Sequence, residues 1–251
     1  MGKPVIDVVY VMLNQYAEAL SETVGPLVSR LNSCVCPARA EHSKSLLRPH
    51  DRLASLVAGA LIDIVSAPFT GGCVVPVVTG AYGKPDFAEG FGLHFSLSHS
   101  RNAACCAVSQ RPVGIDIERS IDSCESLFSL CLADAELACI KDCSNRVERI
   151  RLFTKLWTRK EALGKYLGCG LNELVLRTDV LHWPGDTAGF LVCRHIRGVQ
   201  GAVPQIESFE LFEAYMSVCG YGRVRVTSRT LSDVLAPAAS GICNPSYECE
   251  L

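Results

Sequence analysis

Carboxylates and lysines gather in two short segments of this chain, and together they suit the binding of a divalent cation beside a phosphate. The first segment, residues 114–118, places Asp116 and Glu118 two positions apart in an apolar run. Residues two apart in a strand project from the same face. Such like charges destabilise a strand by up to about 1 kcal/mol unless a cation neutralises them. A solvated strand end with Arg119 as partner is an equally good interpretation of this segment alone.

The second segment, residues 157–165, predicts a helix that carries a third acid. Trp157, Glu161 and Lys165 are four positions apart and would form one stripe of that helix. Lys160 and Lys165 lie within a turn of Glu161. An ordinary salt-bridged helix surface accounts for these charges but not for the tryptophan, which we expect to support the helix by packing.

Three carboxylates, Asp116, Glu118 and Glu161, could therefore serve one metal ion. Coordination by a few protein oxygens suits Mg²⁺, which keeps waters and often takes phosphate oxygens as its remaining ligands. The two lysines would face those phosphates as point charges. The sequence thus predicts a magnesium site beside a phosphate-bearing ligand.

Length and composition indicate a folded protein without a broad electrostatic preference. The chain has 251 residues, of which 49% are hydrophobic and 20% charged, with a net charge of −2. This composition supports a core, and the charge excludes a general attraction to nucleic acid or anionic membranes. No signal peptide pattern opens the chain, because Asp7 interrupts it, and the apolar stretch 53–65 is too short for a membrane span and contains Asp63.

The 14 cysteines favour a reducing compartment. They include no Cys-x-x-Cys pair, and several sit in apolar runs, where a free thiol behaves as a small buried hydrophobe. We therefore expect reduced thiols and a cytoplasmic protein.

Periodicity and turn residues predict an α+β fold. Helical composition is expected at 53–62 and over 123–167. Gly71 and Gly72 should break the chain, Gly83 should lie in a tight loop, and the tail from Ala236 should be loose. Residues 95–100 and 103–108 should form a hairpin, with 113–118 as its third strand. The other predicted strands are 5–13, 74–78, 179–181, 190–193, 208–212, 214–218 and 223–226.

Four motifs in order give the chain a resemblance to one enzyme family. Gly-x-Asp-x-Glu at 114–118 and Trp-x-x-Lys-Glu-x-x-x-Lys at 157–165 resemble the paired signatures of 4′-phosphopantetheinyl transferases of the large, surfactin-synthetase-activating class. Gly83-Lys84-Pro85 is similar to the family's Gly-Lys-Pro loop. Phe-Ser-Leu-Ser-His-Ser at 95–100 is similar to its Phe-Asn-x-Ser-His-Ser segment. The resemblance covers roughly residues 45–180.

The resemblance implies a fold and a reaction. It implies two similar α+β halves around a pseudo-two-fold axis, with coenzyme A between them, in a monomer. We expect an N-terminal half over residues 1–112, a C-terminal half over 113–235 and a tail over 236–251. The implied reaction is Mg²⁺-dependent transfer of 4′-phosphopantetheine from coenzyme A to a serine of an acyl or peptidyl carrier protein.

The resemblance also implies roles for single residues. Asp116, Glu118 and Glu161 would hold Mg²⁺ on the pyrophosphate, and Glu161 or a water held by the acids would be the base. Glu136 falls where some members have a further acid near the metal. Contacts with coenzyme A would come from Lys84, Ser98, His99, Lys160, Lys165, Arg48 and Arg52.

Two other functions fit the same residues. A phosphohydrolase would use the acids with water as nucleophile, and a silent relative would bind coenzyme A or a carrier without turnover. The basic run Arg146, Arg149, Arg151, Lys155 and Arg159 is a solvated helix face or a docking surface for an acidic carrier.

Overall fold

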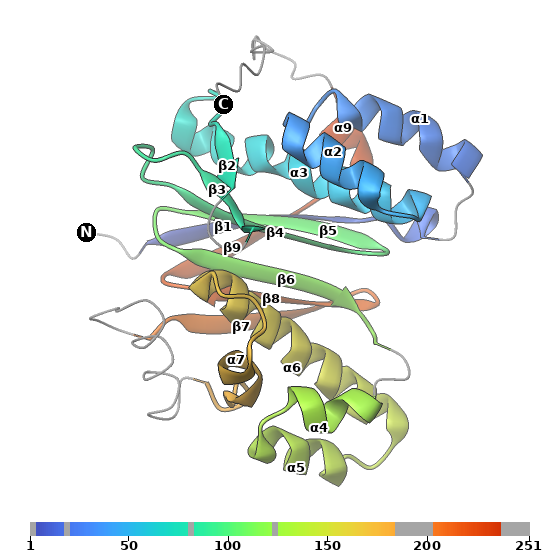
Figure 1. Ribbon diagram of the computed structural model, residues 1–251, viewed down its shortest axis with the longest axis vertical. Helices are drawn as coiled ribbons and strands as arrows, with labels where there is room; N and C mark the ends of the chain where they lie inside the picture. The colour runs from blue at the N-terminus through green and yellow to red at the C-terminus, as the bar shows by residue number, and fades with distance from the viewer. Residues whose placement is uncertain (1–3, 18–20, 80–82, 122–124, 184–202, 237–251) are drawn as a thin grey trace.

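The structure is a computed structural model and describes residues 4–17, 21–79, 83–121, 125–183 and 203–236. Helices and strands form four layers: a group of helices, a four-stranded sheet, a three-stranded sheet and a second group of helices (Figure 1). The fold is α+β, as the sequence predicts.

The first sheet combines both ends of the described chain. Its strand order is β4 (His94–Ser100), β5 (Ala103–Ser109), β1 (Val5–Met12) and β9 (Arg223–Arg229). β1 runs antiparallel to β5 and parallel to β9. The predicted hairpin at 95–108 and the strands at 5–13 and 223–226 are confirmed.

Helices cover the outer face of the first sheet. They are α1 (Ser21–Asn32), α2 (Pro37–Ser45), α3 (Pro49–Thr70) and α9 (Leu231–Leu235), with η1 (Asn14–Tyr16) and a ribbon of β2 (Val77–Thr79) and β3 (Pro85–Phe87) beside them. α3 ends at Gly71, whose φ of 63° suits glycine.

α3 is longer than the sequence suggested. By length and composition this 22-residue helix could cross a membrane, but 67% of its apolar window is buried inside the protein. Its buried side chains pack on the first sheet, so it serves as a core helix.

The second sheet lies against one long helix. Its order is β6 (Val113–Arg119), β8 (Ala214–Gly220) and β7 (Gln205–Leu211), all antiparallel. α6 (Arg146–Leu167) crosses its outer face. The remaining elements of this half are η3 (Glu125–Leu127), α4 (Phe128–Cys131), α5 (Asp134–Asp142) and α7 (Glu173–Arg177).

Strand alternation places the acids of β6 under α6. Ile115 and Ile117 enter the core between the two sheets, together with Ile6 and Val8 of β1. Residues of the opposite parity face the helix layer. The β6 carboxylates therefore lie between strand and helix.

Two strand assignments and the expected division into halves need correction. β6 is not the third strand of the hairpin, because it hydrogen-bonds to β8 in the second sheet. Residues 179–181 form no strand. β9 and α9 fall within the expected C-terminal half, 113–235, yet they complete the first sheet and its helix layer. The predicted strand at 190–193 and the tail beyond 236 lie outside the described residues.

The described cysteines agree with a reduced protein. All ten of them are free thiols, and Cys105 and Cys106 are fully buried.

Gly114 lets β6 approach α6 closely, and its replacement should be costly. A Cβ at this position would lie 2.0 Å from the carbonyl oxygen of Ala162 and 2.4 Å from the amide nitrogen of Tyr166. We expect Gly114→Ala to lower the free energy of unfolding by about 3 kcal/mol, because backbone must move to make room.

Denaturant titration would measure that loss, with Gly25→Ala as the matched control. Gly25 lies in α1, where a Cβ would meet no atom within 4 Å, so its replacement should be neutral or stabilising. Equal stability of the two variants would contradict the close approach of β6 and α6.

Candidate active site

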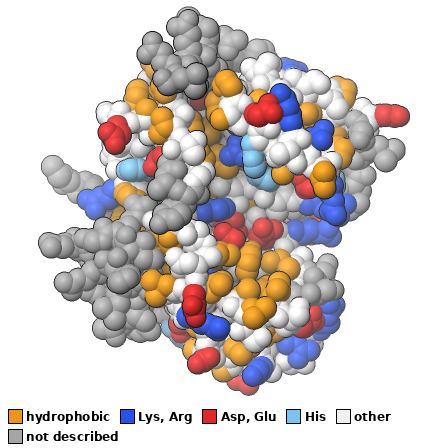
Figure 2. Space-filling view, in the orientation of Figure 1, with side chains coloured by type: hydrophobic (Ala, Val, Ile, Leu, Met, Phe, Trp, Pro, Cys, Tyr) orange, Lys and Arg blue, Asp and Glu red, His pale blue; other side chains and the backbone are white. Residues whose placement is uncertain are grey.

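Three polar side chains from β4, β6 and α6 meet where the two halves of the protein touch. Lys165 Nζ lies 2.8 Å from Asp116 Oδ1 and 2.9 Å from Ser98 Oγ. The Ser98 hydroxyl donates to the same Asp116 oxygen at 2.7 Å. Figure 2 shows acidic side chains in the middle band of this face, with basic side chains on both sides. The contact joins the first sheet to the second sheet and its helix.

The neighbouring acids repel one another electrostatically. Burial, then the charge of Asp116, raises the pKa of Glu118 to about 8, although Lys165 opposes the shift. Burial and Asp116 also raise the pKa of Glu161. Burial lowers the pKa of Lys165, but the charge and hydrogen bond of Asp116, together with the charge of Glu161, raise it above its ordinary value. If all three acids were ionised, the site would therefore hold more negative charge than its lysine neutralises.

This surplus fits a divalent cation. Asp116 Oδ2 is buried and has no hydrogen-bond partner, so one oxygen remains for a ligand. Within the described residues, however, no three potential ligand side chains converge into a preformed metal cluster. The chemistry of the donor set suits Mg²⁺, which needs few protein oxygens, while closure around the ion would require side-chain rotation.

A cavity of about 260 Å³ adjoins these acids. It is lined by Lys84 and Ser96 from the first half and by Glu161 and Lys165 from α6. Lys84 Nζ also donates to the carbonyl of Val113 at 3.2 Å. The cavity thus has a lysine from each half of the protein and adjoins a carboxylate, an arrangement that suits a pyrophosphate.

His99 lies in a second group of cations on the other face of β4. Burial, then the charges of Arg39, Lys165 and His42, lowers the pKa of His99 to about 4. Ser98 and His99 are adjacent in a strand and project to opposite faces. Ser98 consequently serves the carboxylate side, and His99 faces the helix layer.

The sequence pattern of the 4′-phosphopantetheinyl transferase superfamily matches residues 112–202. That span contains both acids of β6 and the whole of α6. Over this span the chain is similar to the 4′-phosphopantetheinyl transferase superfamily.

Related proteins agree with this assignment. The chain is 29% identical to 4′-phosphopantetheinyl transferase Sfp of Bacillus subtilis, over 76% of this chain and 84% of Sfp. It is 36% identical to 4′-phosphopantetheinyl transferase gsp of Aneurinibacillus migulanus, over 36% of this chain and 37% of gsp. It is 37% identical to 4′-phosphopantetheinyl transferase HetI of a Nostoc species, over 37% of this chain and 41% of HetI. The chain thus spans most of Sfp but less than half of gsp and HetI.

Lys160 does not contact the cavity beside Asp116, contrary to the expectation from the sequence that it contacts coenzyme A. Its ammonium group is fully buried and donates to the carbonyls of Leu176 and Thr178. Its third partner, at 2.8 Å, is Glu136. Lys160 has three ammonium protons and three partners, so none is left for a ligand.

Glu136 also does not have the role that the sequence interpretation gave it, a further acid near the metal. It is fully buried, and its two oxygens accept from the amides of Ala133 and Val180 as well as from Lys160. A carboxylate so occupied is not a further acid for the metal.

Arg48 and Arg52 are the basic residues that the sequence predicts as ligands in the N-terminal half. They are not among the charged groups that shift the pKa of His99. Arg52 donates to the carbonyl of Leu46, and Arg48 is an exposed residue at the start of α3. Arg39 and His42 lie one turn apart on α2 and influence His99. Their i,i+3 spacing would have revealed a shared face if residues 37–45 had been recognised as a helix.

Glu118 should make the metal-free protein less stable as pH rises. Its pKa in the folded state, about 8, exceeds its ordinary value of 4.5, so the folded state binds more protons between these values. Stability should therefore fall as pH rises from about 4.5 to about 8. Glu118→Gln should remove this loss, and its advantage over the wild type should grow from about pH 5.5 to about pH 8.5.

Urea titrations in the presence of a chelator would measure the difference. Glu89→Gln, at an exposed acid before β4, is the control for loss of one charge. A Glu118→Gln advantage that does not change with pH would show that Glu118 ionises normally.

Proposed function

We propose that the protein is a holo-acyl-carrier-protein synthase, transferring 4′-phosphopantetheine from coenzyme A to a serine of an acyl or peptidyl carrier protein. The observation that carries the proposal is the contact of Asp116 with Lys165 and Ser98 beside a cavity lined by two lysines. Similarity to the superfamily supports the reaction class. Adenosine 3′,5′-bisphosphate would be the leaving group.

We propose that Asp116, Glu118 and Glu161 hold Mg²⁺ on the pyrophosphate of coenzyme A. The unpartnered Asp116 oxygen and the mutual repulsion of the acids support this assignment. When bound, Mg²⁺ would neutralise charge on the phosphate oxygens. Lys84 and Lys165, which both line the cavity, would add positive charge, and His99 with Arg39 and His42 would bind phosphate at the nucleotide end.

The chain's acids can also take the proton that the reaction releases. The carrier serine oxygen forms a bond to the phosphorus bound to pantetheine, and the bond from that phosphorus to the bridging pyrophosphate oxygen breaks. The serine proton passes to Glu161 or to a water held by the acids. A raised pKa makes Glu161 a stronger base than an ordinary carboxylate.

We further propose that the two halves are related by a pseudo-two-fold axis. β1, α3, β4 and β5 have the same chain order as β6, α6, β7 and β8, and their sheets have the matching orders β4-β5-β1 and β7-β8-β6. Both long helices have 22 residues and end at a left-handed glycine. The free thiols of the described chain support a cytoplasmic location, and we propose a monomer because both sides of the cavity come from one chain.

Transfer to a carrier tests the proposal directly. The protein, coenzyme A, Mg²⁺ and an apo carrier protein should increase the carrier's mass by one phosphopantetheine, as seen by intact-protein mass spectrometry. Glu161→Gln should lower kcat roughly a thousand-fold, since it removes a base and a metal ligand. It should keep part of the coenzyme A binding.

The other outcomes are distinct. Release of phosphate or nucleotide without a carrier would identify a phosphohydrolase, and binding without turnover a silent relative. Loss of all coenzyme A binding in Glu161→Gln would show that Glu161 is only a ligand and not the base. A panel of carriers from fatty acid, polyketide, peptide and lysine pathways would define the acceptor.

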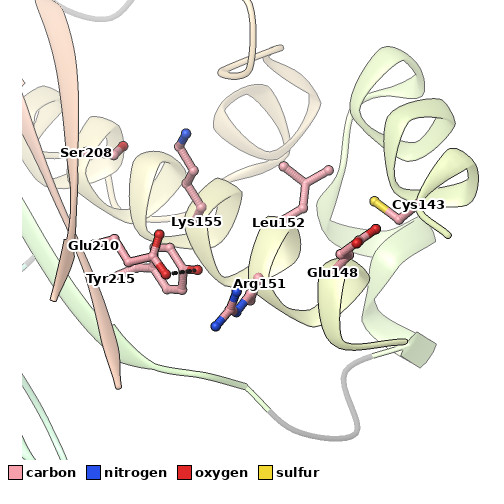
Figure 3. A pocket seen from close by; sticks show the side chains of 8 residues that line it. All are labelled: Cys143, Glu148, Arg151, Leu152, Lys155, Ser208, Glu210 and Tyr215. Atoms are coloured by element: carbon pink, nitrogen blue, oxygen red, sulfur yellow. Dashed lines mark hydrogen bonds between the residues drawn. The ribbon is translucent and has the colours of Figure 1, made fainter. Parts of the chain in front are cut away.

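We also propose that an acidic carrier docks beside the amino-terminal half of α6. A cavity of about 510 Å³ is lined there by Arg151, Lys155, Glu210 and Tyr215 (Figure 3). Glu210 accepts from the Tyr215 hydroxyl, whereas Arg151 and Lys155 form no side-chain hydrogen bond or ion pair within the described chain. Two available cations suit carboxylates of a partner.

The other three residues of the basic run, Arg146, Arg149 and Arg159, are not among those that line this cavity. Arg146 pairs with Glu125, and Arg159 is buried. The docking proposal is thus narrowed to Arg151 and Lys155. β8 pairs Tyr215 with Glu118, so the cavity and the metal acids share one sheet face.

Reversing both charges should weaken carrier binding. We expect Arg151→Glu with Lys155→Glu to raise the KM for the carrier about tenfold, equivalent to about 1.4 kcal/mol, and to leave the KM for coenzyme A unchanged. Steady-state kinetics at several salt concentrations would measure this, with Arg223→Glu and Arg229→Glu on β9 as the matched control. An unchanged carrier KM, or one equally raised in the control, would contradict docking at this cavity.

A further inference from the structure

Three consecutive residues of α6, directly before Glu161, carry buried polar side chains. Thr158 and Lys160 are 0% exposed, and Arg159 is 8% exposed. Burying a cation costs stability unless it is paired and hydrogen-bonded. These residues therefore need partners, and each finds them on a different element.

Thr158 and Arg159 connect α6 to the second sheet and to the segment that contains Val180, before β7. The Thr158 hydroxyl lies 2.8 Å from that of Ser217 on β8. Arg159 Nε donates to the carbonyl of Val180 at 2.6 Å, and Nη1 donates to that of Ile206 at 3.2 Å. The helix is thus tied to both inner and edge strands of the second sheet.

Lys160 connects α6 to α5 and to the segment after α7. Its ammonium group lies 2.8 Å from Glu136 Oε2 and 2.6 Å from the carbonyl oxygen of Thr178. The other Glu136 oxygen accepts from the amide of Val180 at 2.7 Å. Because every strong donor and acceptor of this pair is used, its geometry is fully specified.

Successive helix residues project about 100° apart, so these contacts surround α6. Apolar packing alone is not directional and tolerates small rotations of a helix. Hydrogen bonds have narrow ranges of length and angle. The three residues consequently fix both the rotation and the axial position of α6 at the level of its catalytic acid.

We propose that Lys160 and Glu136 are positioning residues, which hold α6 so that Glu161 and Lys165 meet Asp116. The inference rests on the proposed function. Misplacement of a reacting group by about 1 Å can cost a hundred-fold in rate. The pair acts on catalysis only through the orientation of the helix, since neither side chain reaches the cavity.

Replacing the pair as a unit separates positioning from stability. Lys160→Met with Glu136→Leu removes both charges and leaves neither unpaired, which avoids the larger loss caused by one unpaired buried charge. The amides of Ala133 and Val180 and the carbonyls of Leu176 and Thr178 lose their partners, so we expect a lower melting temperature than that of the wild type, and kinetics are measured below it. We also expect kcat to fall 10- to 100-fold, and the Mg²⁺ concentration for half-maximal rate to rise several-fold.

A second readout does not depend on activity. Mg²⁺ with coenzyme A should raise the melting temperature of the wild type more than that of the double variant, because the acids of the variant are less well placed. The matched control is Lys44→Met with Glu41→Leu, a Lys–Glu pair of 2.7 Å on the surface of α2, which should change neither readout. If the double variant does not fold, Glu136→Gln replaces it in the test. This variant retains an acceptor for the amide of Val180 and should show the same rise in Mg²⁺ requirement.

A folded double variant with wild-type kcat and Mg²⁺ dependence would overturn the proposal and leave the pair a purely structural role. The same holds if Glu136→Gln keeps the wild-type Mg²⁺ requirement. Failure of the wild type to modify any carrier is a different result, because it would overturn the proposed function itself.

Discussion

The site depends on a buried aspartate that is only half satisfied. One oxygen of Asp116 accepts from Ser98 and Lys165, which belong to different halves of the protein. The other oxygen is buried without a partner. An unpaired buried polar atom normally costs about 1–3 kcal/mol, so its retention points to a ligand. The same residue therefore joins the two halves and offers an oxygen to the cation that we propose.

Local patterning was enough to predict the elements that carry the acids. Alternation predicted β6, and four-residue spacing predicted the stripe of Glu161 and Lys165 on α6. Both signals are local, because they depend on which side of one strand or helix is buried. Motif order then supplied the family and the reaction class.

Contacts between distant segments were not predictable in this way. Lys160 lies within the matched motif and one position before Glu161, yet its partner Glu136 is 24 positions earlier on another helix. A helix pattern predicts the direction in which a side chain projects, but not which residues it contacts. Arg39 and His42 were missed for a related reason, since α2 has few apolar residues and its helical period is weak.

The parallel pairing of β9 with β1 has a consequence for how the chain acquires its structure. Asp7 and Arg225 form an ion pair across 218 positions of sequence, and between them lies the whole second sheet. During synthesis, one edge of β1 must stay open until β9 has emerged. Such late, non-local strand pairing slows folding and leaves an edge exposed to unwanted partners. The amino-terminal part of the enzyme is thus completed last.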